Sequence, residues 1–353
     1  MQRRRAACGV LIALAVWLAV CAGPSDATAR GAVSSSATSS KPVTVPVHII
    51  GGQGSLQGAR PVVAVKVGNG ADVPVLLDTG SSGLRIFDTA VPSGSKSGVA
   101  ISTQPSNIRY AGGHRFTGVV ATASITIGSQ RTARPVRFGL VQNVSCARGK
   151  PKCPAAHGMA GFEKYGGYGI LGIGTESSGG GIVSPLLGMP GALGDSWSLH
   201  LKARTGQLIL GASLPRPSAI AATLPMKQIG AAPGGRRLWG DDRIALCLTI
   251  GSATGCAPGL LDSGTYTLQA YGQPFDQVPT VARRVQSGIA VSVRRAGAKQ
   301  SFWRFSTGST KSKDLVTIRG AKKLFINTGV QTFFDFIVTY SDLRGTVVLA
   351  RSP

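Results

Sequence analysis

The feature that most constrains this chain is a six-residue motif that occurs twice. Residues 76–81 read Leu-Leu-Asp-Thr-Gly-Ser, and residues 260–265 read Leu-Leu-Asp-Ser-Gly-Thr. Repetition of a motif at long separation indicates an internal duplication, so each half of the chain should carry a similar structural unit. Each copy places its aspartate directly after an apolar pair, and we expect Asp78 and Asp262 to emerge from buried strands.

A single copy of this motif would have a simple structural explanation, because aspartate and glycine favour turns and aspartate caps helices well. Two copies are harder to explain in that way. Burial of two carboxylates is costly unless they are hydrogen-bonded or share a proton. Two carboxyl groups about 3 Å apart cannot ionise together, so one can act as a base and the other as an acid toward a bound water. We therefore predict that Asp78 and Asp262 form a catalytic pair.

The residues that follow each aspartate suit such a pair. A hydroxyl directly after the aspartate can hydrogen-bond across the pair, and the glycine that comes next lets backbone amides approach the carboxylate. The supporting residues predicted on this ground are Thr79, Gly80, Ser81, Ser263, Gly264 and Thr265.

Strands and turns should dominate the chain. The 49 glycines and 20 prolines among 353 residues disfavour long helices. Alternating apolar residues over 62–67 and 73–77, with a Gly-Asn-Gly turn between them, predict two strands. Further expectations are a strand over 119–127, hairpins over 199–210, 244–250 and 333–349, and a short helix within 279–287. The predicted fold class is therefore all-β.

The N-terminal segment has the form of a targeting sequence. Residues 1–29 contain three arginines, an uncharged apolar run and an Ala-Thr-Ala cleavage site, which predicts a signal peptide. The alternatives are an uncleaved anchor, for which the apolar run is short of the about 20 residues required, and lipidation at Cys21. Residues 30–41 are rich in Ser, Ala and Thr and predict a flexible tether. We expect a protein that is secreted, or located in the periplasm or cell envelope.

Four cysteines remain after removal of the signal peptide, in two pairs that are close in sequence. In an exported protein such pairs predict two local disulfides, Cys146–Cys153 and Cys247–Cys256. Metal binding is the alternative, but Cys-x-x-Cys spacing and neighbouring histidines are missing. We predict no metal and no cofactor.

The charge of the chain is strongly positive, at +24. Residues 1–29 hold three arginines and one aspartate, so the mature chain keeps +22. Such a charge favours adsorption to anionic surfaces, and an anionic cell envelope is a candidate partner. The basic residues are scattered and few aromatics lie among them, so we predict a solvated basic surface, a monomer and no specific nucleic-acid partner.

Several segments together resemble the pepsin family of aspartic proteases over nearly all the mature chain. The resemblance is closest to bacterial members, including the protease domains of some mycobacterial surface proteins. Residues 78–82 and 262–265 match the two active-site motifs. The other matching segments are 110–118 for the flap hairpin, 169–174 for the apolar-apolar-Gly brace of the first loop, 197–211 for inter-lobe strands and 333–350 for closing strands.

The resemblance implies a bilobal fold of two β-barrel-like lobes with an active-site cleft between them. Residues 42–204 would form the N-terminal lobe with the first aspartate and the flap, and residues 205–353 the C-terminal lobe. The implied activity is that of a secreted endopeptidase that hydrolyses peptide bonds through water activated by the aspartate pair. Its substrate would be a protein or peptide with apolar residues around the cut.

The chain departs from the family pattern at a few positions. Arg85 stands where the family usually has a tryptophan that supports the flap, and residues 327–329, Asn-Thr-Gly, replace the second apolar-apolar-Gly brace. Ala111 replaces a flap glycine, and a long propeptide is missing. We expect Tyr110 on the flap with Arg85 beneath it, both at the substrate-binding face.

Two other functions remain open from the sequence. A non-catalytic protein- or peptide-binding module could use the same fold, since a fold does not determine a function. A basic protein that adheres to the envelope is the third interpretation. Loss of either aspartate would favour a binding role, and both are present. A Gly-x-Ser-x-Gly motif is missing, which argues against an α/β-hydrolase.

Overall fold

The computed structural model describes residues 41–51, 58–308 and 314–352. The predicted signal peptide and all of the predicted tether except Lys41 lie outside these residues. Strands dominate the described part, which contains 28 strands, two α-helices and seven short 3-10 helices. The all-β prediction is therefore confirmed.

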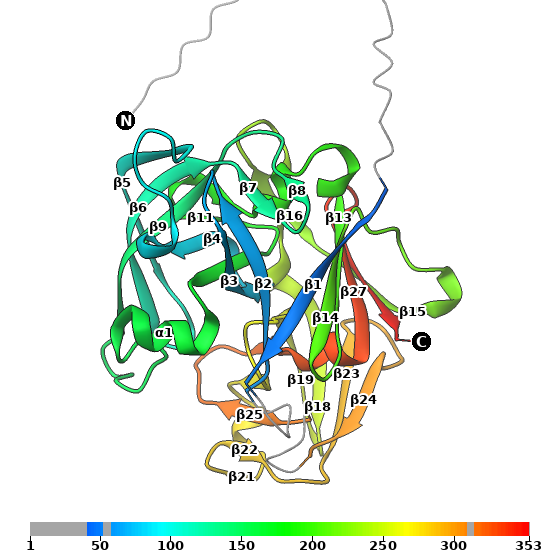
Figure 1. Cartoon of the computed structure of the whole chain (residues 1–353). Helices are drawn as coiled ribbons and strands as arrows, with labels where there is room; N and C mark the ends of the chain where they lie inside the picture. Colours follow the sequence, from blue (N-terminus) through cyan, green and yellow to red (C-terminus); the bar gives the residue numbers. More distant parts are fainter. Residues whose placement is uncertain (1–40, 52–57, 309–313, 353) are drawn as a thin grey trace, which may run out of the picture. The chain divides into compact units, whose positions relative to one another are not determined.

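The larger sheet has 15 strands and draws on both halves of the sequence (Figure 1). Its strands are β1 (Val43–Ile50), β2 (Arg60–Val67), β3 (Asp72–Asp78), β4 (Ser82–Phe87), β5 (Val99–Arg109), β6 (His114–Ala123), β7 (Ile125–Ile127), β8 (Gln130–Arg131), β9 (Val136–Cys146), β10 (Gly169–Ile173), β13 (Ser196–Leu201), β14 (Thr205–Leu210), β15 (Ile220–Pro225), β27 (Phe336–Ser341) and β28 (Thr346–Arg351). The main order is β15-β28-β27-β13-β14-β1-β2-β3-β10-β4-β9-β6-β5, with β7 paired to β2 and β8 paired to β7.

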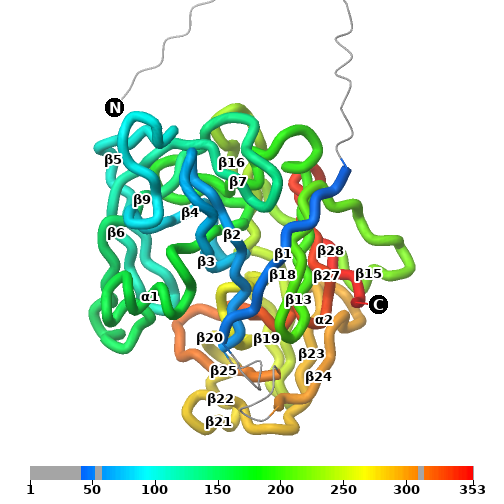
Figure 2. Tube along the Cα trace, viewed as in Figure 1, coloured from blue at the N-terminus to red at the C-terminus, as the bar shows by residue number. Residues whose placement is uncertain are grey.

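The second sheet has nine strands and is formed by the yellow and orange chain at the bottom of Figure 2. Its strands are β18 (Ile244–Ile250), β19 (Ala253–Leu260), β20 (Leu268–Tyr271), β21 (Thr280–Val281), β22 (Arg284–Val285), β23 (Ala290–Arg295), β24 (Trp303–Ser306), β25 (Val316–Arg319) and β26 (Phe325–Asn327). The order is β21-β22-β25-β20-β26-β19-β18-β23-β24. The architecture is bilobal, as expected, although neither large sheet closes into a barrel among the described strands.

The remaining elements are small. Two hairpin-like pairs join β11 (Ser177–Ser178) to β12 (Ile182–Val183) and β16 (Lys227–Ala231) to β17 (Arg237–Gly240). The α-helices are α1 (Gly158–Gly166) and α2 (Gln331–Asp335). In the part of the chain that the structure describes, no helix is both long and apolar enough to cross a bilayer.

The first and last strands of the described chain belong to one sheet. β1 pairs antiparallel with β14, β14 with β13, and β13 with β27, so that blue, green and red strands lie side by side in Figure 1. Trp197 and Tyr340, paired across β13 and β27, are fully buried and stack with ring centroids 5.9 Å apart. The predicted lobe boundary at residues 204 and 205 lies at the turn of the β13–β14 hairpin and stays a prediction.

The two copies of the motif occupy corresponding places, each at the end of a strand that has a parallel neighbour. β3 ends at Asp78 and has β10 as a parallel neighbour, with Leu76 opposite Ile170. β19 ends at Leu260, two residues before Asp262, and has β26 as a parallel neighbour, with Leu260 opposite Asn327. Each aspartate thus follows a strand that is held by a parallel partner, as the repeated motif predicted.

Apolar patterning explains the strands near the site. In β2, Val63, Val65 and Val67 are buried while Ala64 is exposed, because alternate side chains of a strand face opposite sides. The strands expected over 62–67 and 73–77 are confirmed as β2 and β3, and the 199–210 hairpin as β13–β14. The hairpin expected over 244–250 was placed too narrowly, because these residues form the single strand β18 and its antiparallel partner β19 covers residues 253–260. The run over 119–127 is divided between β6 and β7 at Ser124.

Two expectations about secondary structure were wrong, one about a helix and one about where a hairpin begins. Residues 279–287 form the β21–β22 hairpin instead of a helix, with Ala282 and Arg283 at φ values of 49° and 68° in its two-residue turn. Two consecutive left-handed residues suit the twist of a tight hairpin, and they interrupt any right-handed helix. Phe333 lies in α2, so the C-terminal hairpin begins only at Phe336.

Candidate active site

The two aspartate loops face each other at close range. Asp78 and Asp262 are 6% and 8% exposed. The carboxylate of each accepts the backbone N–H of the glycine two residues later, at 2.8 Å in both loops. A Cβ added to Gly80 would lie 2.5 Å from Asp262 Oδ1, and one added to Gly264 would lie 2.5 Å from Asp78 Oδ1. Glycine is therefore required at both positions for the carboxyl groups to meet.

Thr79 and Ser263 join the loops by four crossed hydrogen bonds. The Thr79 N–H donates to Ser263 Oγ at 3.0 Å, and the Ser263 N–H donates to Thr79 Oγ1 at 2.8 Å. The Thr79 hydroxyl donates to the Leu261 carbonyl at 2.7 Å, and the Ser263 hydroxyl donates to the Leu77 carbonyl at 2.8 Å. Because each hydroxyl both accepts and donates, the two loops are held in a fixed mutual position.

The second oxygen of each carboxylate, Oδ2, is here called its outer oxygen, and it accepts a hydrogen bond from a different kind of donor in each loop. The Ser81 hydroxyl donates to Asp78 Oδ2 at 2.6 Å. Thr265 holds the position in the second motif that Ser81 holds in the first. Within the described residues, however, the Thr265 hydroxyl makes no hydrogen bond to the Asp262 carboxylate. The amide Nδ2 of Asn327 donates to Asp262 Oδ2 instead, at 2.6 Å.

The role of Asn327 was missed in the sequence. Asn327 ends β26, is 5% exposed, and its Oδ1 accepts the Gly329 N–H at 2.9 Å. The available signal was the departure of residues 327–329 from an apolar-apolar-Gly brace, to which no role was assigned. The polar residue at that position has a partner, the carboxylate of Asp262.

The two carboxyl groups interact electrostatically and share a hydrogen bond. The pKa of Asp78 is raised to about 8, first by burial and then by the charge of Asp262, against the opposing hydrogen bonds from Ser81 and Gly80. Such an environment keeps one proton on the pair over a wide range of pH, since a second negative charge would be buried beside the first.

The carboxyl groups line a cleft with a volume of about 1150 Å³. Residues from both halves of the chain line it, including Tyr110 and Tyr165 from the first and Tyr266 and Tyr271 from the second. Apolar side chains such as Leu76, Ile170 and Ile318 also contribute to the walls. A cleft of this size and mixed lining can accommodate several residues of an extended peptide.

Tyr110 lies at the end of the β5–β6 hairpin, which was predicted as the flap. Its N–H donates to the His114 carbonyl at 3.0 Å, and its carbonyl accepts the Gly113 N–H at 2.9 Å, which closes the turn. The Tyr110 ring stacks on the His114 ring with centroids 4.5 Å apart and meets Phe116 edge-on. Burial raises the pKa of Tyr110, so its phenol stays protonated beside the cleft.

Comparison with known proteins agrees with this geometry. The model of the PE-PGRS C-terminal aspartyl peptidase-like domain family matches residues 43–342. The chain belongs to this family. The crystal structure of an aspartic proteinase from Irpex lacteus is similar, with a TM-score of 0.57 and 18% identity, covering 88% of this chain and 98% of that one. No curated protein matches the chain.

Arg85 of this aspartyl peptidase-like domain is buried, with an exposed fraction of 2%. Its side chain passes over Gly139 in β9, where an added Cβ would lie 2.3 Å from the Arg85 Cδ. Its guanidinium donates to Ser178 Oγ at 2.7 Å and to the Leu84 carbonyl at 3.2 Å. Arg85 therefore lies close enough for its charge to oppose the raised pKa of Tyr110, while its hydrogen bonds are made elsewhere.

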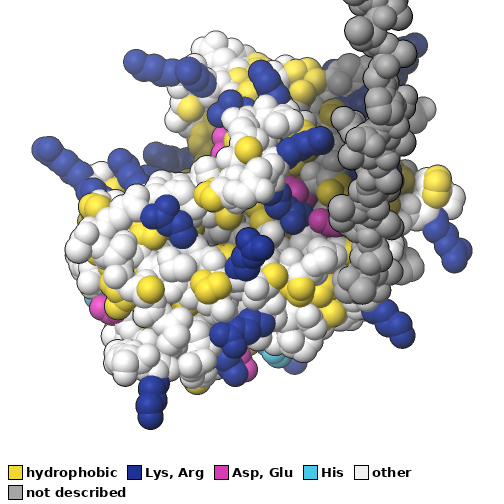
Figure 3. Space-filling model, turned by 90° about the horizontal axis from the view of Figure 1, so that it is seen from above, with side chains coloured by type: hydrophobic (Ala, Val, Ile, Leu, Met, Phe, Trp, Pro, Cys, Tyr) yellow, Lys and Arg dark blue, Asp and Glu magenta, His cyan; other side chains and the backbone are white. Residues whose placement is uncertain are grey.

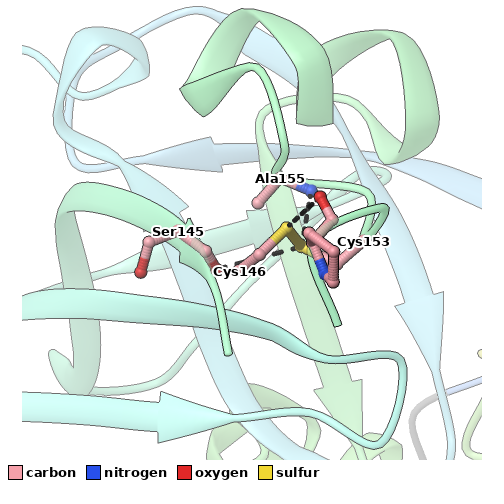
Figure 4. Close-up of a disulfide and its surroundings, with 5 residues drawn as sticks. Ser145, Cys146, Cys153 and Ala155 are labelled. Atoms are coloured by element: carbon pink, nitrogen blue, oxygen red, sulfur yellow. Dashed lines mark hydrogen bonds between the residues drawn. A yellow bond between two sulfur atoms is a disulfide. The ribbon is translucent and has the colours of Figure 1, made fainter. Parts of the chain in front are cut away.

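The sulfur atoms of the aspartyl peptidase-like domain pair as predicted. Cys146 bonds to Cys153 with an S–S distance of 2.09 Å, and Cys247 bonds to Cys256 at 1.97 Å. Figure 4 shows the first disulfide, whose Cys153 sulfur accepts the Ala155 N–H at 3.2 Å. The second joins directly opposed residues of β18 and β19.

The first disulfide closes a loop that contacts the flap. The Ala147 N–H donates to the Gly113 carbonyl at 2.7 Å, and the Lys150 ammonium donates to the Ala111 carbonyl at 2.5 Å. The flap turn is thus attached on one side to a covalently closed loop.

Basic side chains are spread over the surface of the aspartyl peptidase-like domain. Figure 3 shows Lys and Arg side chains at many separate points of one face, with few Asp and Glu among them. This distribution agrees with the scattered positions in the sequence, and it gives that face no single concentrated basic patch.

Proposed function

We propose that this protein is an aspartic endopeptidase that hydrolyses peptide bonds with Asp78 and Asp262 as its catalytic pair. The observation that carries the proposal is the hydrogen-bonded pair of carboxyl groups, held by matched loops and open to a cleft. The pKa of Asp78, raised to about 8, supports a pair that keeps one proton. This is the condition for acid and base to act together on one water.

The proton of the resting pair is assigned to Asp78 and the negative charge to Asp262. An amide N–H can only donate, so Asn327 favours a carboxylate on Asp262, whereas the Ser81 hydroxyl can donate to Asp78 or accept from it. A water between them would lose a proton to Asp262 and attack the peptide carbonyl carbon. Asp78 would donate its proton to the carbonyl oxygen, which gives a neutral tetrahedral diol.

Collapse of this intermediate completes the reaction. Asp262 returns its proton to the leaving nitrogen as the C–N bond breaks, and Asp78 takes a proton back from the diol hydroxyl as the new carboxyl group forms. The pair therefore ends with the single proton with which it began. Tyr110, with its protonated phenol at the cleft, would help the flap to hold the substrate backbone.

The apolar part of the lining, which includes Leu76, Ile170 and Ile318, favours apolar side chains around the cut, because those substrate side chains would leave water as they pack against it. We also propose export by the segment 1–29, action as a monomer in or outside the cell envelope, and lobes that meet near residue 204. The two disulfides support an oxidising compartment.

Cleavage of a mixed peptide library by the chain from Arg30 onward tests the proposal. The assay runs from pH 3 to 7, with and without pepstatin, an inhibitor of aspartic proteases. We expect cleavage that pepstatin suppresses. Peptide binding to the cleft with no cleavage at any pH would contradict the proposal and would support the non-catalytic binding module.

A further inference from the structure

Apart from the aspartate pair and His114, the charged side chains that line the cleft are all lysines and arginines. The acidic side chains that line it are only Asp78 and Asp262, within the described residues. The cationic ones are Lys150, Lys152, Arg283 and Arg319. They come from both sides of the pair: two from the loop closed by the first disulfide, one from the turn of the β21–β22 hairpin, and one from the end of β25.

These cations have no carboxylate partners in the part of the chain that the structure describes. Ion pairs of the described residues include those that join Arg236 to Asp195 and Asp342, and Arg243 to Asp242. Lys150 makes its hydrogen bond to a backbone carbonyl of the flap. The four charges are therefore available to a ligand that enters the cleft.

Arg319 has the strongest need for such a ligand. It is half-buried, and its Nε is buried with no hydrogen-bond partner among the described residues. Burial raises the pKa of Tyr271, and the positive charge of Arg319 partly offsets this rise. A half-buried guanidinium without a carboxylate partner is costly, and an incoming carboxylate would pair with its charge.

We propose that the cleft selects peptide segments in which aspartate or glutamate side chains flank an apolar cut site. Lys150 and Lys152 would hold acidic residues on the flap side, and Arg283 and Arg319 would hold them on the opposite side. This inference rests on the proposed function, since it names the substrate class of the same cleft. A peptide is favoured over a nucleic acid or polysaccharide because the cations surround the carboxyl pair rather than a separate surface.

The protonation states of enzyme and substrate are compatible with this choice. Peptide carboxyl groups ionise near pH 4. The pKa of Asp78 is raised to about 8 by burial and by Asp262, so the pair keeps its proton above that pH. A singly protonated pair and ionised acidic side chains therefore coexist from roughly pH 5 to 7. The positive charge of the whole chain also steers anionic peptides toward it.

Two matched peptides test the proposal. Both carry the same apolar cut site, one flanked on each side by glutamate and the other by glutamine, and kcat/KM is measured at pH 6 and low salt. We expect the glutamate peptide to be cleaved about tenfold better, mainly through KM, and the ratio to fall as salt is added. A ratio of one for the wild-type protein overturns the inference.

Variants assign the preference to the cleft. Arg319→Gln and Lys152→Gln should each lower the glutamate-to-glutamine ratio, and Lys152 is exposed, so that variant should fold normally. Arg304→Gln, on β24 and outside the cleft lining, removes the same charge and should leave the ratio unchanged. A ratio that Arg304→Gln lowers as much as the cleft variants would contradict a local site.

A binding assay separates this inference from the proposed function. If the wild-type protein cleaves neither peptide, the proposed function fails, and fluorescence anisotropy with the same labelled peptides then measures their affinities. Tighter binding of the glutamate peptide would still support the inference, and equal binding would overturn it. A single-stranded oligonucleotide of equal charge serves as competitor; equal competition would show a general polyanion site and would also overturn it.

Discussion

The loop that carries Asp78 and the loop that carries Asp262 exchange the same crossed hydrogen bonds, yet each carboxylate has a different outer donor. Asp78 receives the hydroxyl of Ser81 from its own motif. Asp262 receives the amide of Asn327 from the neighbouring strand β26. The shared part follows from the repeated motif, and the difference gives two chemically similar carboxyl groups unequal surroundings. Unequal surroundings are what allow one carboxyl group to act as acid and the other as base.

The strongest test of the shared part is a methyl group at the point of contact. Gly80→Ala and Gly264→Ala each place a Cβ 2.5 Å from the opposing carboxylate. The reaction rate falls steeply when the reacting groups are displaced, so we expect each change to lower kcat by about 100-fold. Gly230→Ala, whose Cβ would meet nothing within 4 Å, is the control. Loss of activity in only one of the two loop variants would break the symmetry.

The unequal part is tested by removing each outer donor. Asn327→Leu leaves Asp262 Oδ2 without its donor in a site where Asn327 is 5% exposed, and we expect a fall in kcat of about 10- to 100-fold. Ser81→Ala should cost only about 3- to 10-fold, because Ser81 is half-buried and water can replace its hydroxyl. Equal losses would show that the two donors are equivalent.

The pH profile of Ser81→Ala should move at its alkaline end. The Ser81 hydrogen bond lowers the pKa of Asp78, so Ser81→Ala should raise that pKa and move the alkaline limb of kcat/KM to higher pH. Asn327 makes its hydrogen bond to Asp262 and not to Asp78, so the same limb should stay in place in Asn327→Leu. An alkaline limb that both variants move equally would contradict the assignment of acid and base.

A smaller effect, on stability and not on activity, is expected from Glu176, which lies outside the cleft lining. The pKa of Glu176 is raised to about 8, first by burial and then by its hydrogen bond with Asp242. Because the folded state keeps this proton above the ordinary glutamate pKa, stability falls as pH rises from about 4.5 toward 8. Glu176→Gln should therefore lose fewer degrees of Tm between pH 5 and 7.5 than wild type. Glu163→Gln on α1 is the control, and an unchanged loss in Glu176→Gln would refute this origin.

The sequence was most informative where a pattern carries its own geometry. The two motifs predicted that the two aspartate loops meet and that Thr79 and Ser263 hydrogen-bond across them, because a hydroxyl directly after each aspartate can reach the opposing loop. The alternating valines over residues 62–67 predicted β2, because this pattern also depends only on the local sequence. The contact between Asn327 and Asp262 could not be predicted locally, since it depends on the parallel pairing of β26 with β19.

The errors also have physical causes. Ala282 and Arg283 adopt left-handed backbone conformations, for which glycine and asparagine are the usual signals, so their turn resembled part of a helix. α1 contains Gly161 and begins and ends at glycines, and its low intrinsic helix propensity gave no sign of a helix. Tertiary packing decides both segments more than local preference does, because α1 packs against β3, β9 and β10 of the first sheet, and β22 pairs with β25 in the second.

The central claim is that Asp78 and Asp262 act as one catalytic unit. The most direct measurement is kcat on one cleaved peptide for Asp78→Asn, Asp262→Asn and the double variant, with urea unfolding to show that each is folded. Each single change should lower kcat by at least about 1000-fold and the double change no further, because removal of either member removes the shared proton. A single variant that keeps kcat within about tenfold of wild type would contradict the account.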